Sequence, residues 1–145
     1  MSTELLLPSP AGLTARRQGD RLLLTGEGGE LPFSLEGTLQ CGQCFGWWQD
    51  GEGWWQGVVG NTFCRAREEG DAVAFTGLRP GEEGAILSYF DWERDYRAAR
   101  ELLCRNPVLR RAVAFAPGIR LLRQDPWEAL CSFILSQNNN IPRIQ

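Results

Sequence analysis

The stretch Asp50–Thr76, DGEGWWQGVVGNTFCRAREEGDAVAFT, decides the fold class of this 145-residue chain. It holds three segments rich in Trp, Phe and Val, separated by short runs of turn residues: Trp54–Val59, Thr62–Arg67 and Ala72–Thr76. This pattern is typical of an antiparallel meander, and Asp50-Gly51 at its start is a hairpin signal. Parallel strands would need helical crossovers between them, for which the stretch has no room.

Upstream of the meander the sequence predicts one more strand and a short helix. Arg21–Thr25 is an apolar run of strand length. Leu35–Leu39 has the length of a single helical turn, and we expect a strand at about residues 42–48 directly after it.

Beyond Pro80 the hydrophobic period becomes helical. The candidate helices are Glu82–Phe90, Asp95–Cys104, Asn106–Ala116 and residues 125–136. The last one begins with Asp125-Pro126-Trp127-Glu128, which fits a capping box, and its apolar residues then recur along one helix face. A sheet followed by helices predicts the α+β class. The expected domain boundary lies further along, between about residues 105 and 120.

Composition narrows the class of protein further. With 43% hydrophobic and 23% charged residues the chain is globular. Its apolar runs are too short to span a bilayer and no export signal is visible, so we expect a cytoplasmic protein without a membrane partner. Residues 94–145 carry nine arginines and four acidic residues, which indicates either a local anion-binding face or merely solvated helix surfaces.

Every basic residue of the chain is an arginine, because the sequence contains no lysine and no histidine. Arginine stays protonated in proteins and is therefore a poor base or nucleophile. Lysine Schiff-base chemistry and histidine-based triads are excluded for these residues, the N-terminal amine aside.

The chain closes on SQNNNIPRIQ, residues 136–145. One interpretation is structural: the helix ends near Ser136, the asparagines form a turn, and Asn140 caps a further helix with Pro142 in its first turn. That interpretation uses only one or two of the asparagines. The alternative is that the amides contact something polar that is not protein. Because the apolar stripe of the helix at 125–136 has no later helix to pack on, we also expect this sequence to be part of a longer chain.

Three stretches carry a family resemblance: GQCFGW at residues 42–47, YFDWERDY at 89–96 and GIRLLRQDPWEALCSFILSQNNNIPRI at 118–144. Together they resemble the 8-oxoguanine DNA glycosylase family of base-excision repair, from about Leu31 to the end of the sequence. The resemblance implies a TATA-box-protein-like antiparallel domain at residues 1–110. It also implies that residues 111–145 are the start of an all-α helix-hairpin-helix glycosylase domain.

The resemblance also implies site residues. An enzyme that flips a base out of a duplex must fill the gap, and asparagine has the donors and acceptor to do so. Asn138 corresponds to the residue in the gap, Asn139 and Asn140 to residues that shape the turn, and Arg143 to a reader of the unpaired cytosine. Gly42 corresponds to the residue whose carbonyl reads the lesion, and Gly46 stands where the family tends to carry a bulkier residue, often arginine.

The family implies excision of 8-oxoguanine opposite cytosine, with AP lyase activity through a catalytic lysine and aspartate. Both of these would lie beyond Gln145, in agreement with the absence of lysine. We therefore expect this chain to bind damaged double-stranded DNA as a monomer in the cytoplasm, associated with the nucleoid. We expect it to need no cofactor or metal and to be inactive alone.

Three other interpretations remain open. Cys41-Gly42-Gln43-Cys44 is a C-x-x-C pair, but it lacks the second close pair or histidines that a structural zinc needs, and aromatic strand residues follow it. The tryptophan pairs 47–48 and 54–55 could stack on single strands, although one member of each pair should face the core. The chain could also be a non-catalytic β-sheet module that binds DNA or protein.

Overall fold

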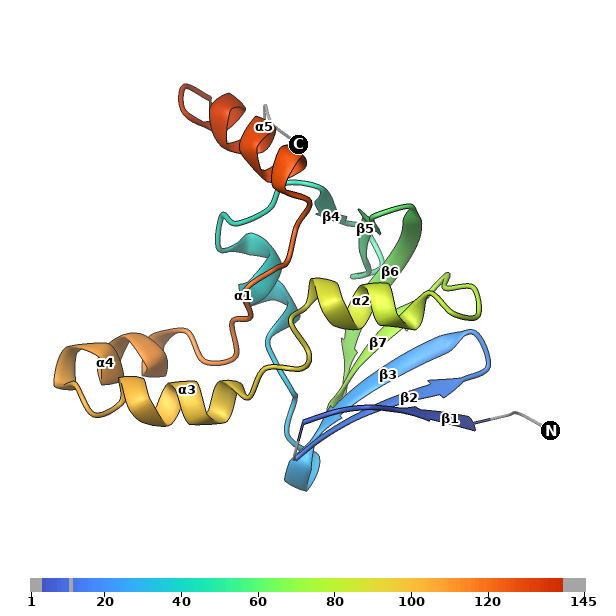
Figure 1. Cartoon of the computed structure of the whole chain (residues 1–145), viewed down its shortest axis with the longest axis horizontal. Helices are drawn as coiled ribbons and strands as arrows, with labels where there is room; N and C mark the ends of the chain where they lie inside the picture. The colour runs from blue at the N-terminus through green and yellow to red at the C-terminus, as the bar shows by residue number, and fades with distance from the viewer. Residues whose placement is uncertain (1–3, 11, 140–145) are drawn as a thin grey trace.

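The computed structural model describes residues 4–10 and 12–139, which form one antiparallel sheet surrounded by helices (Figure 1). The strands are β1 (Glu4–Leu7), β2 (Leu13–Gln18), β3 (Arg21–Gly26), β4 (Trp47–Gln49), β5 (Trp55–Val59), β6 (Thr62–Glu69) and β7 (Ala72–Thr76). The helices are the 3-10 turn η1 (Glu27–Gly29), α1 (Leu35–Gln40), α2 (Glu83–Tyr89), α3 (Tyr96–Leu103), α4 (Pro107–Phe115) and α5 (Pro126–Ser136). The α+β class is thus confirmed.

The sheet joins two meanders. Its strand order is β1-β2-β3-β7-β6-β5-β4, so that β3 and β7 pair across the middle, where Leu22 lies opposite Phe75 and Leu24 opposite Val73. The three strands predicted between residues 54 and 76 are confirmed as β5, β6 and β7. The sequence did not predict β1 and β2, because β2 has a single buried residue, Ala15, and so lacks a clear alternation of apolar and polar residues.

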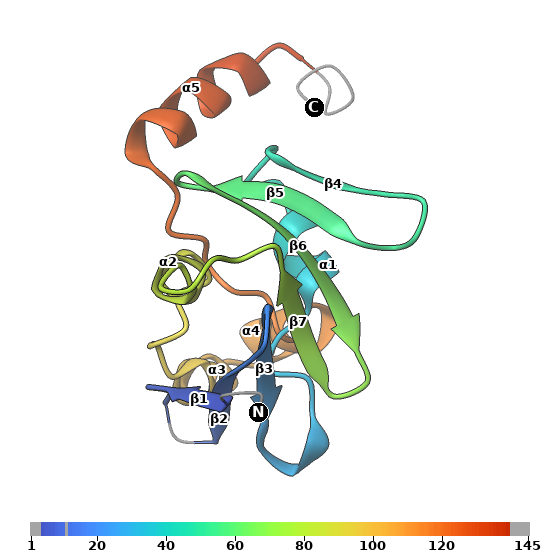
Figure 2. The ribbon, with the colours of Figure 1, turned by 90° about the vertical axis from the view of Figure 1, so that its right-hand side faces the viewer.

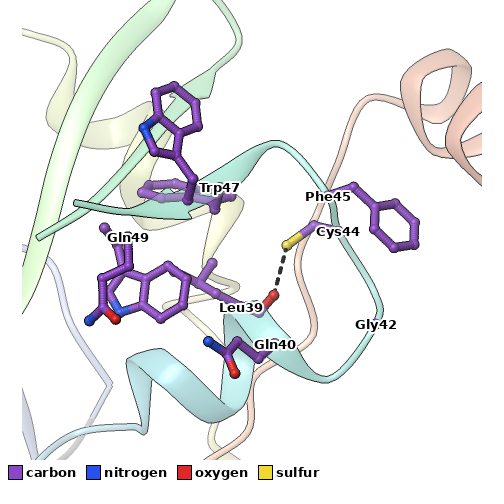
Figure 3. A pocket seen from close by; sticks show the side chains of 9 residues that line it. Leu39, Gln40, Gly42, Cys44, Phe45, Trp47 and Gln49 are labelled. Atoms are coloured by element: carbon purple, nitrogen blue, oxygen red, sulfur yellow. Dashed lines mark hydrogen bonds between the residues drawn. The ribbon is translucent and has the colours of Figure 1, made fainter. Parts of the chain in front are cut away.

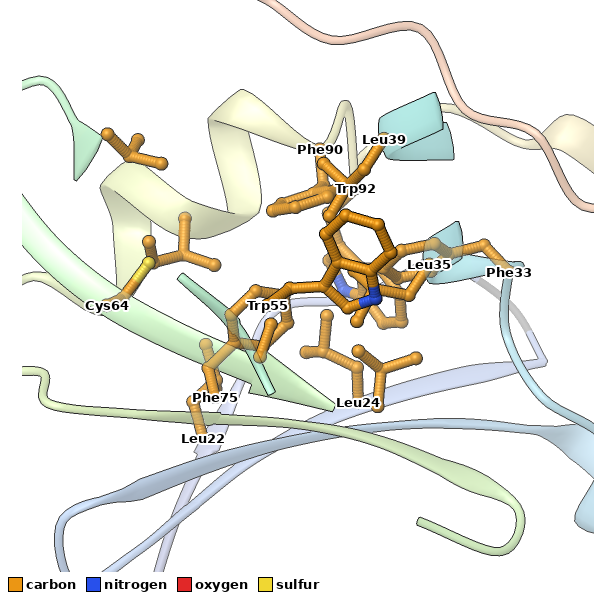
Figure 4. Close-up of a cluster of buried hydrophobic side chains, with 14 of the residues drawn as sticks. Leu22, Leu24, Phe33, Leu35, Leu39, Trp55, Cys64, Phe75, Phe90 and Trp92 are labelled. Atoms are coloured by element: carbon orange, nitrogen blue, oxygen red, sulfur yellow. The ribbon is translucent and has the colours of Figure 1, made fainter. Parts of the chain in front are cut away.

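The core lies between one face of the sheet and helices α1 and α2 (Figures 2 and 4). Phe90 is at its centre, with its ring centroid 5.4 Å from that of Phe33 and 5.2 Å from that of Phe75. Trp47 and Trp55 are buried in this core, whereas Trp48 is 50% exposed. One tryptophan of each pair therefore faces the core, as predicted. This leaves fewer exposed rings on which the bases of a single-stranded nucleic acid could stack.

The strand expected at residues 42–48 is much shorter than predicted. Residues 41–46 form a loop, and β4 begins only at Trp47. Gly42 has a φ of +87°, which is incompatible with extended backbone. The polar residues that follow it bond to other parts of the chain instead of to a neighbouring strand.

Helices α3 and α4 pack on each other at one end of the molecule, and α5 lies at the other end (Figures 1 and 2). Each begins at a side-chain cap, formed by Asp95, Asn106 and Asp125 respectively, and none of the three has a fully buried residue. The division expected at residues 110 and 111 falls inside α4 and stays a prediction. Among the described helices, none is long and apolar enough to cross a membrane.

Candidate functional site

Gly42 lies in the loop of residues 41–46, between α1 and β4. Its φ of +87° is in the left-handed region, which glycine adopts at little cost, and a Cβ built on it would meet no atom within 4 Å. The residue is exposed, and its carbonyl oxygen accepts no hydrogen bond from the described residues. Gly42 therefore presents a backbone acceptor that a ligand can approach closely.

A cavity of about 410 Å³ opens beside Gly42 (Figure 3). Its lining combines aromatic rings with amide side chains: Leu39, Gln40, Gly42, Cys44, Phe45, Trp47, Trp48, Gln49 and Trp55. Aromatic walls with a few polar groups suit a flat ligand that also carries hydrogen-bond donors.

The polar groups beneath this cavity are held in their neutral forms. Burial, and then the neighbouring Cys41, raises the pKa of the Cys44 thiol to about 12. Burial likewise raises the pKa of the Tyr89 phenol, whose oxygen accepts a hydrogen bond from Trp47 Nε1 at 3.1 Å. A thiol with so high a pKa is not a nucleophile near neutral pH, so this region is suited to recognition and not to covalent chemistry.

Both thiols of the C-x-x-C pair donate to carbonyls of α1. The Cys41 thiol donates to Thr38 O at 3.3 Å and the Cys44 thiol to Leu39 O at 3.5 Å, the latter contact being drawn in Figure 3. Within residues 4–10 and 12–139 there is no group of three or more His, Cys, Asp or Glu residues placed to hold a metal ion.

Helix α5 leads to the asparagine run. The Asp125 carboxylate accepts hydrogen bonds from the N–H groups of Trp127 and Glu128, at 2.9 and 3.1 Å, and Pro126 fills the first helical position. The helix was predicted from this cap and is confirmed. Its apolar face is open among the described residues, with Trp127 72% and Phe133 60% exposed.

The asparagines follow the C-terminus of α5. Asn139 Nδ2 donates to Leu135 O at 2.9 Å, which satisfies one of the free carbonyls of the last turn. Asn138 is exposed in the same turn. Asn140 and Arg143 lie outside the described residues, so the roles given to this group stay predictions.

Residues 118–125, called the connector here, join α4 to α5. Four successive amide groups of the connector have four different acceptors: Arg120 N donates to Thr38 Oγ1, Leu121 N to the Tyr96 hydroxyl, Leu122 N to Gln43 Oε1 and Arg123 N to Tyr89 O. The connector is thus fixed to α1, α2, α3 and the Gly42 loop at once. This arrangement sets where α5 and its asparagines stand relative to Gly42.

Sequence analysis overlooked Arg120, which is 2% exposed. Its guanidinium donates to the carbonyls of Phe90 and Asp91, both at 2.8 Å, and lies 4.2 Å from the centre of the Tyr96 ring. The sequence does contain a signal for this role: Arg120 is the only charged residue in the apolar stretch GIRLL. A charged side chain in such surroundings must either reach solvent or have all its donors hydrogen-bonded.

Comparison with known proteins decides the family. The family model described as "8-oxoguanine DNA glycosylase, N-terminal domain" matches residues 28–130, which is most of the chain. The chain belongs to the 8-oxoguanine DNA glycosylase family. The resemblance inferred from the sequence is therefore confirmed.

Relatives within this family include the N-glycosylase/DNA lyase OGG1 of Arabidopsis thaliana, 32% identical over 122 residues, which are 79% of this chain and 33% of that protein. The N-glycosylase/DNA lyase of Saccharomyces cerevisiae is 70% identical over 27 residues, 19% of this chain and 7% of that protein. This chain thus spans about a third of the Arabidopsis glycosylase.

Solved structures of 8-oxoguanine glycosylases share the fold. MBOgg1 in complex with a low-affinity DNA ligand superposes with a TM-score of 0.80 at 37% identity, over 91% of this chain and 45% of MBOgg1. The 8-oxoguanine glycosylase/lyase of Clostridium acetobutylicum, bound to duplex DNA with cytosine opposite 8-oxoguanine, gives 0.79 at 32% identity, over 95% of this chain and 46% of that one. The α+β architecture is therefore that of the family's glycosylases.

Proposed function

We propose that this chain is the lesion-recognition part of an enzyme that removes 8-oxoguanine from duplex DNA. The observation that carries the proposal is the exposed residue Gly42, whose carbonyl accepts no hydrogen bond from the described residues, in the lining of an aromatic cavity and in a chain of this family. Oxidation changes N7 of guanine from an acceptor to an N–H donor. A fixed carbonyl bonds that donor and is left unsatisfied against normal guanine, a difference on the order of 1–3 kcal/mol.

The asparagine run supports the same proposal from the side of the duplex. Asn138 is exposed directly after α5, where its amide can enter the gap that a flipped base leaves and replace lost hydrogen bonds. Arg143 supplies N–H donors for the acceptor edge of the orphan cytosine. Excision only opposite cytosine is chemically sensible. If 8-oxoguanine were excised opposite a misincorporated adenine, repair would copy the adenine and make the mutation permanent.

Catalysis is the step that these residues do not supply. The chain has no lysine, and an imine with the sugar requires an amine. We expect the 145-residue chain to bind 8-oxoguanine duplex as a monomer, but to neither excise the base nor cleave the strand. Borohydride trapping on such DNA should give no covalent adduct, and an adduct that survives blocking of the N-terminal amine would contradict this.

The recognition proposal is tested with a matched pair of glycine variants. Gly42→Ala forces alanine to a φ of +87° and places a methyl beside the proposed acceptor. Gly53→Ala imposes nearly the same backbone strain, at a φ of +82°, in the turn between β4 and β5. Fluorescence anisotropy with duplexes containing 8-oxoguanine or guanine opposite cytosine gives the preference of each variant.

We expect wild type and Gly53→Ala to share one preference for 8-oxoguanine, and Gly42→Ala to lose it by about tenfold, the size of one unsatisfied buried acceptor. A wild-type chain without any preference for the lesion would overturn the proposed function. Binding without preference would instead favour a general DNA-binding module.

A further inference from the structure

Gln43, the residue next to Gly42, takes part in four hydrogen bonds, more than any other residue of the loop. Its Nε2 donates to Thr38 O at 3.0 Å and to Arg120 O at 2.7 Å, and its Oε1 accepts from Leu122 N at 2.9 Å. The Gln43 carbonyl also accepts a hydrogen bond from Gln124 Nε2. Three of these four bonds reach the connector.

The geometry fixes the orientation of the Gln43 amide. Nε2 faces two carbonyl oxygens and Oε1 faces an N–H group, so a flipped amide would oppose like partners at all three contacts. Asparagine is too short by one methylene, glutamate at neutral pH has no donor, and lysine has no acceptor. Glutamine is the side chain of this length that satisfies all three partners.

Apart from Gln43, the loop is held by Cys44, which packs in the core and does not reach the connector. Outside the ladders of helices and sheet, residues 42–45 make no backbone–backbone hydrogen bond with the described part of the chain. The thiol contacts of Cys41 and Cys44 return to α1 and are weak donors. The position of Gly42 relative to the connector therefore depends on Gln43.

The connector is itself anchored at the other end. The guanidinium of Arg120 bonds to the carbonyls after α2, and Arg123 N donates to Tyr89 O at 2.8 Å. From the connector the chain enters α5 at its Asp125 cap and reaches Asn138 after it. Gln43 is thus the link between the loop that carries Gly42 and the segment that carries the asparagines.

We propose that Gln43 is a positioning residue, which holds the Gly42 carbonyl in register with the connector so that lesion reading and gap filling occur at a fixed spacing. This inference rests on the proposed function of Gly42. A carbonyl discriminates an N–H donor from an acceptor only if it cannot retreat from the wrong partner, because hydrogen-bond energy falls steeply with distance and angle. Loss of the Gln43 bonds should therefore reduce discrimination more than affinity.

The test compares Gln43→Met with Gln56→Met in the full 145-residue chain. Gln43→Met keeps the length of the side chain and removes its donors and its acceptor. Gln56→Met is the same substitution in β5, where it removes the hydrogen bond from Gln56 Nε2 to Asp50 Oδ2 at 2.7 Å. Gln56 lies neither in the Gly42 loop nor against the connector, so it serves as the matched control for a lost side-chain hydrogen bond.

Binding to 8-oxoguanine and guanine duplexes is measured well below the melting temperature of each variant. We expect the preference for 8-oxoguanine to fall about tenfold in Gln43→Met, as for a lost bond to a fixed acceptor, and to stay at the wild-type value in Gln56→Met. An unchanged preference in Gln43→Met, with wild type showing one, overturns the inference and leaves the proposed function standing. A wild-type chain without preference overturns the proposed function itself.

A second measurement tests the loop without DNA. Cys44 is in the Gly42 loop and Cys64 is in β6, and both thiols are buried. A short pulse of alkylating agent followed by mass spectrometry gives their relative reactivity. Gln43→Met should raise the labelling of Cys44 relative to Cys64 severalfold, whereas Gln56→Met should not. Equal ratios in Gln43→Met and wild type would show that Gln43 does not hold the loop.

Discussion

At the scale of single residues, Gly57 in β5 leaves the room that Trp47 occupies. A Cβ on Gly57 would lie 2.4 Å from Trp47 Cδ2, and the Trp47 ring is buried in the core. We expect Gly57→Ala to lower the free energy of unfolding by about 1–3 kcal/mol, the usual cost of overpacking a core. Urea denaturation followed by tryptophan fluorescence measures this.

The matched control is Gly84→Ala in α2. That glycine is exposed and a Cβ there would meet nothing within 4 Å. Because alanine is the better helix former, this variant should be unchanged or up to about 1 kcal/mol more stable. A stable Gly57→Ala variant would show that the Trp47 ring can be displaced from its place beside the cavity.

Gly46 lies beside Glu128, which has no ion pair among the described residues. A Cβ on Gly46 would lie 3.6 Å from Glu128 Oε1, and the backbone there is not left-handed. We expect Gly46→Arg to pair with Glu128 and to raise the stability of α5 by at most about 1 kcal/mol. Thermal melts at low and high salt should show a gain that high salt removes, and a gain independent of salt would contradict the ion pair.

At the scale of elements, α5 is a well-capped helix with an uncovered apolar face. Its exposed apolar residues are Trp127, Leu130, Phe133, Ile134 and Leu135. By contrast, β6 and β7 each pair with a strand on both sides, and their residues Cys64, Val73 and Phe75 are buried in the core. Packing, not propensity, stabilises most protein helices. We expect amide hydrogen exchange to be much faster in α5 than in β6 and β7. Equal protection would show that the α5 face is covered in solution.

How well the sequence predicted each element follows from the range of the interactions that form it. The β5–β7 meander and the helices from α2 to α5 are determined by turn residues, caps and periodicity within a few positions, and all were predicted. The strand predicted at about residues 42–48 was wrong over most of its length. The conformation there depends on Gln43, which bonds to residues nearly eighty positions later, and a local pattern cannot reveal such bonds. For the same reason Gly42 was found through its family, while Gln43 and Arg120 required the structure.

At the scale of the whole molecule, Asp91 joins the segments that surround the core. The residue has a φ of +50° and its side chain is 2% exposed. Its carboxylate lies 2.6 Å from Arg94 Nε and 2.6 Å from Arg123 Nη2, and the Tyr96 hydroxyl donates to it at 2.9 Å. It thus connects the end of α2 with the start of α3 and with the connector.

Burial alone would raise the pKa of the Asp91 carboxyl, but hydrogen bonds from Tyr96 and Arg94 and the nearby charge of Arg123 outweigh it and hold the pKa below its ordinary value of 3.8. A carboxyl with a lowered folded-state pKa stabilises the fold fully above its unfolded pKa. That contribution is lost as the pH falls through the lower folded pKa. Glu69 and Glu83 also have lowered pKa values, through hydrogen bonds from arginines and, for Glu83, from backbone N–H groups as well, that outweigh the effect of burial. The free energy of unfolding should therefore decline on acidification below about pH 4.

Removal of the Asp91 carboxylate should lower the free energy of unfolding near neutral pH and make its decline on acidification less steep. We expect Asp91→Asn to be less stable near neutral pH by about 1–3 kcal/mol, because a buried carboxylate that accepts hydrogen bonds from Tyr96 and Arg94 is lost, and to lose less on acidification than wild type. The control is Glu101→Gln on α3, an exposed acid without an ion pair among the described residues, whose curve should follow wild type. Urea denaturation from about pH 7 to about pH 3 gives the three curves. If the Asp91→Asn curve ran parallel to wild type at a constant offset, its carboxylate would not titrate with unfolding. The acid sensitivity of the fold would then come from the pairs on the sheet, and not from the junction that places the connector and α5.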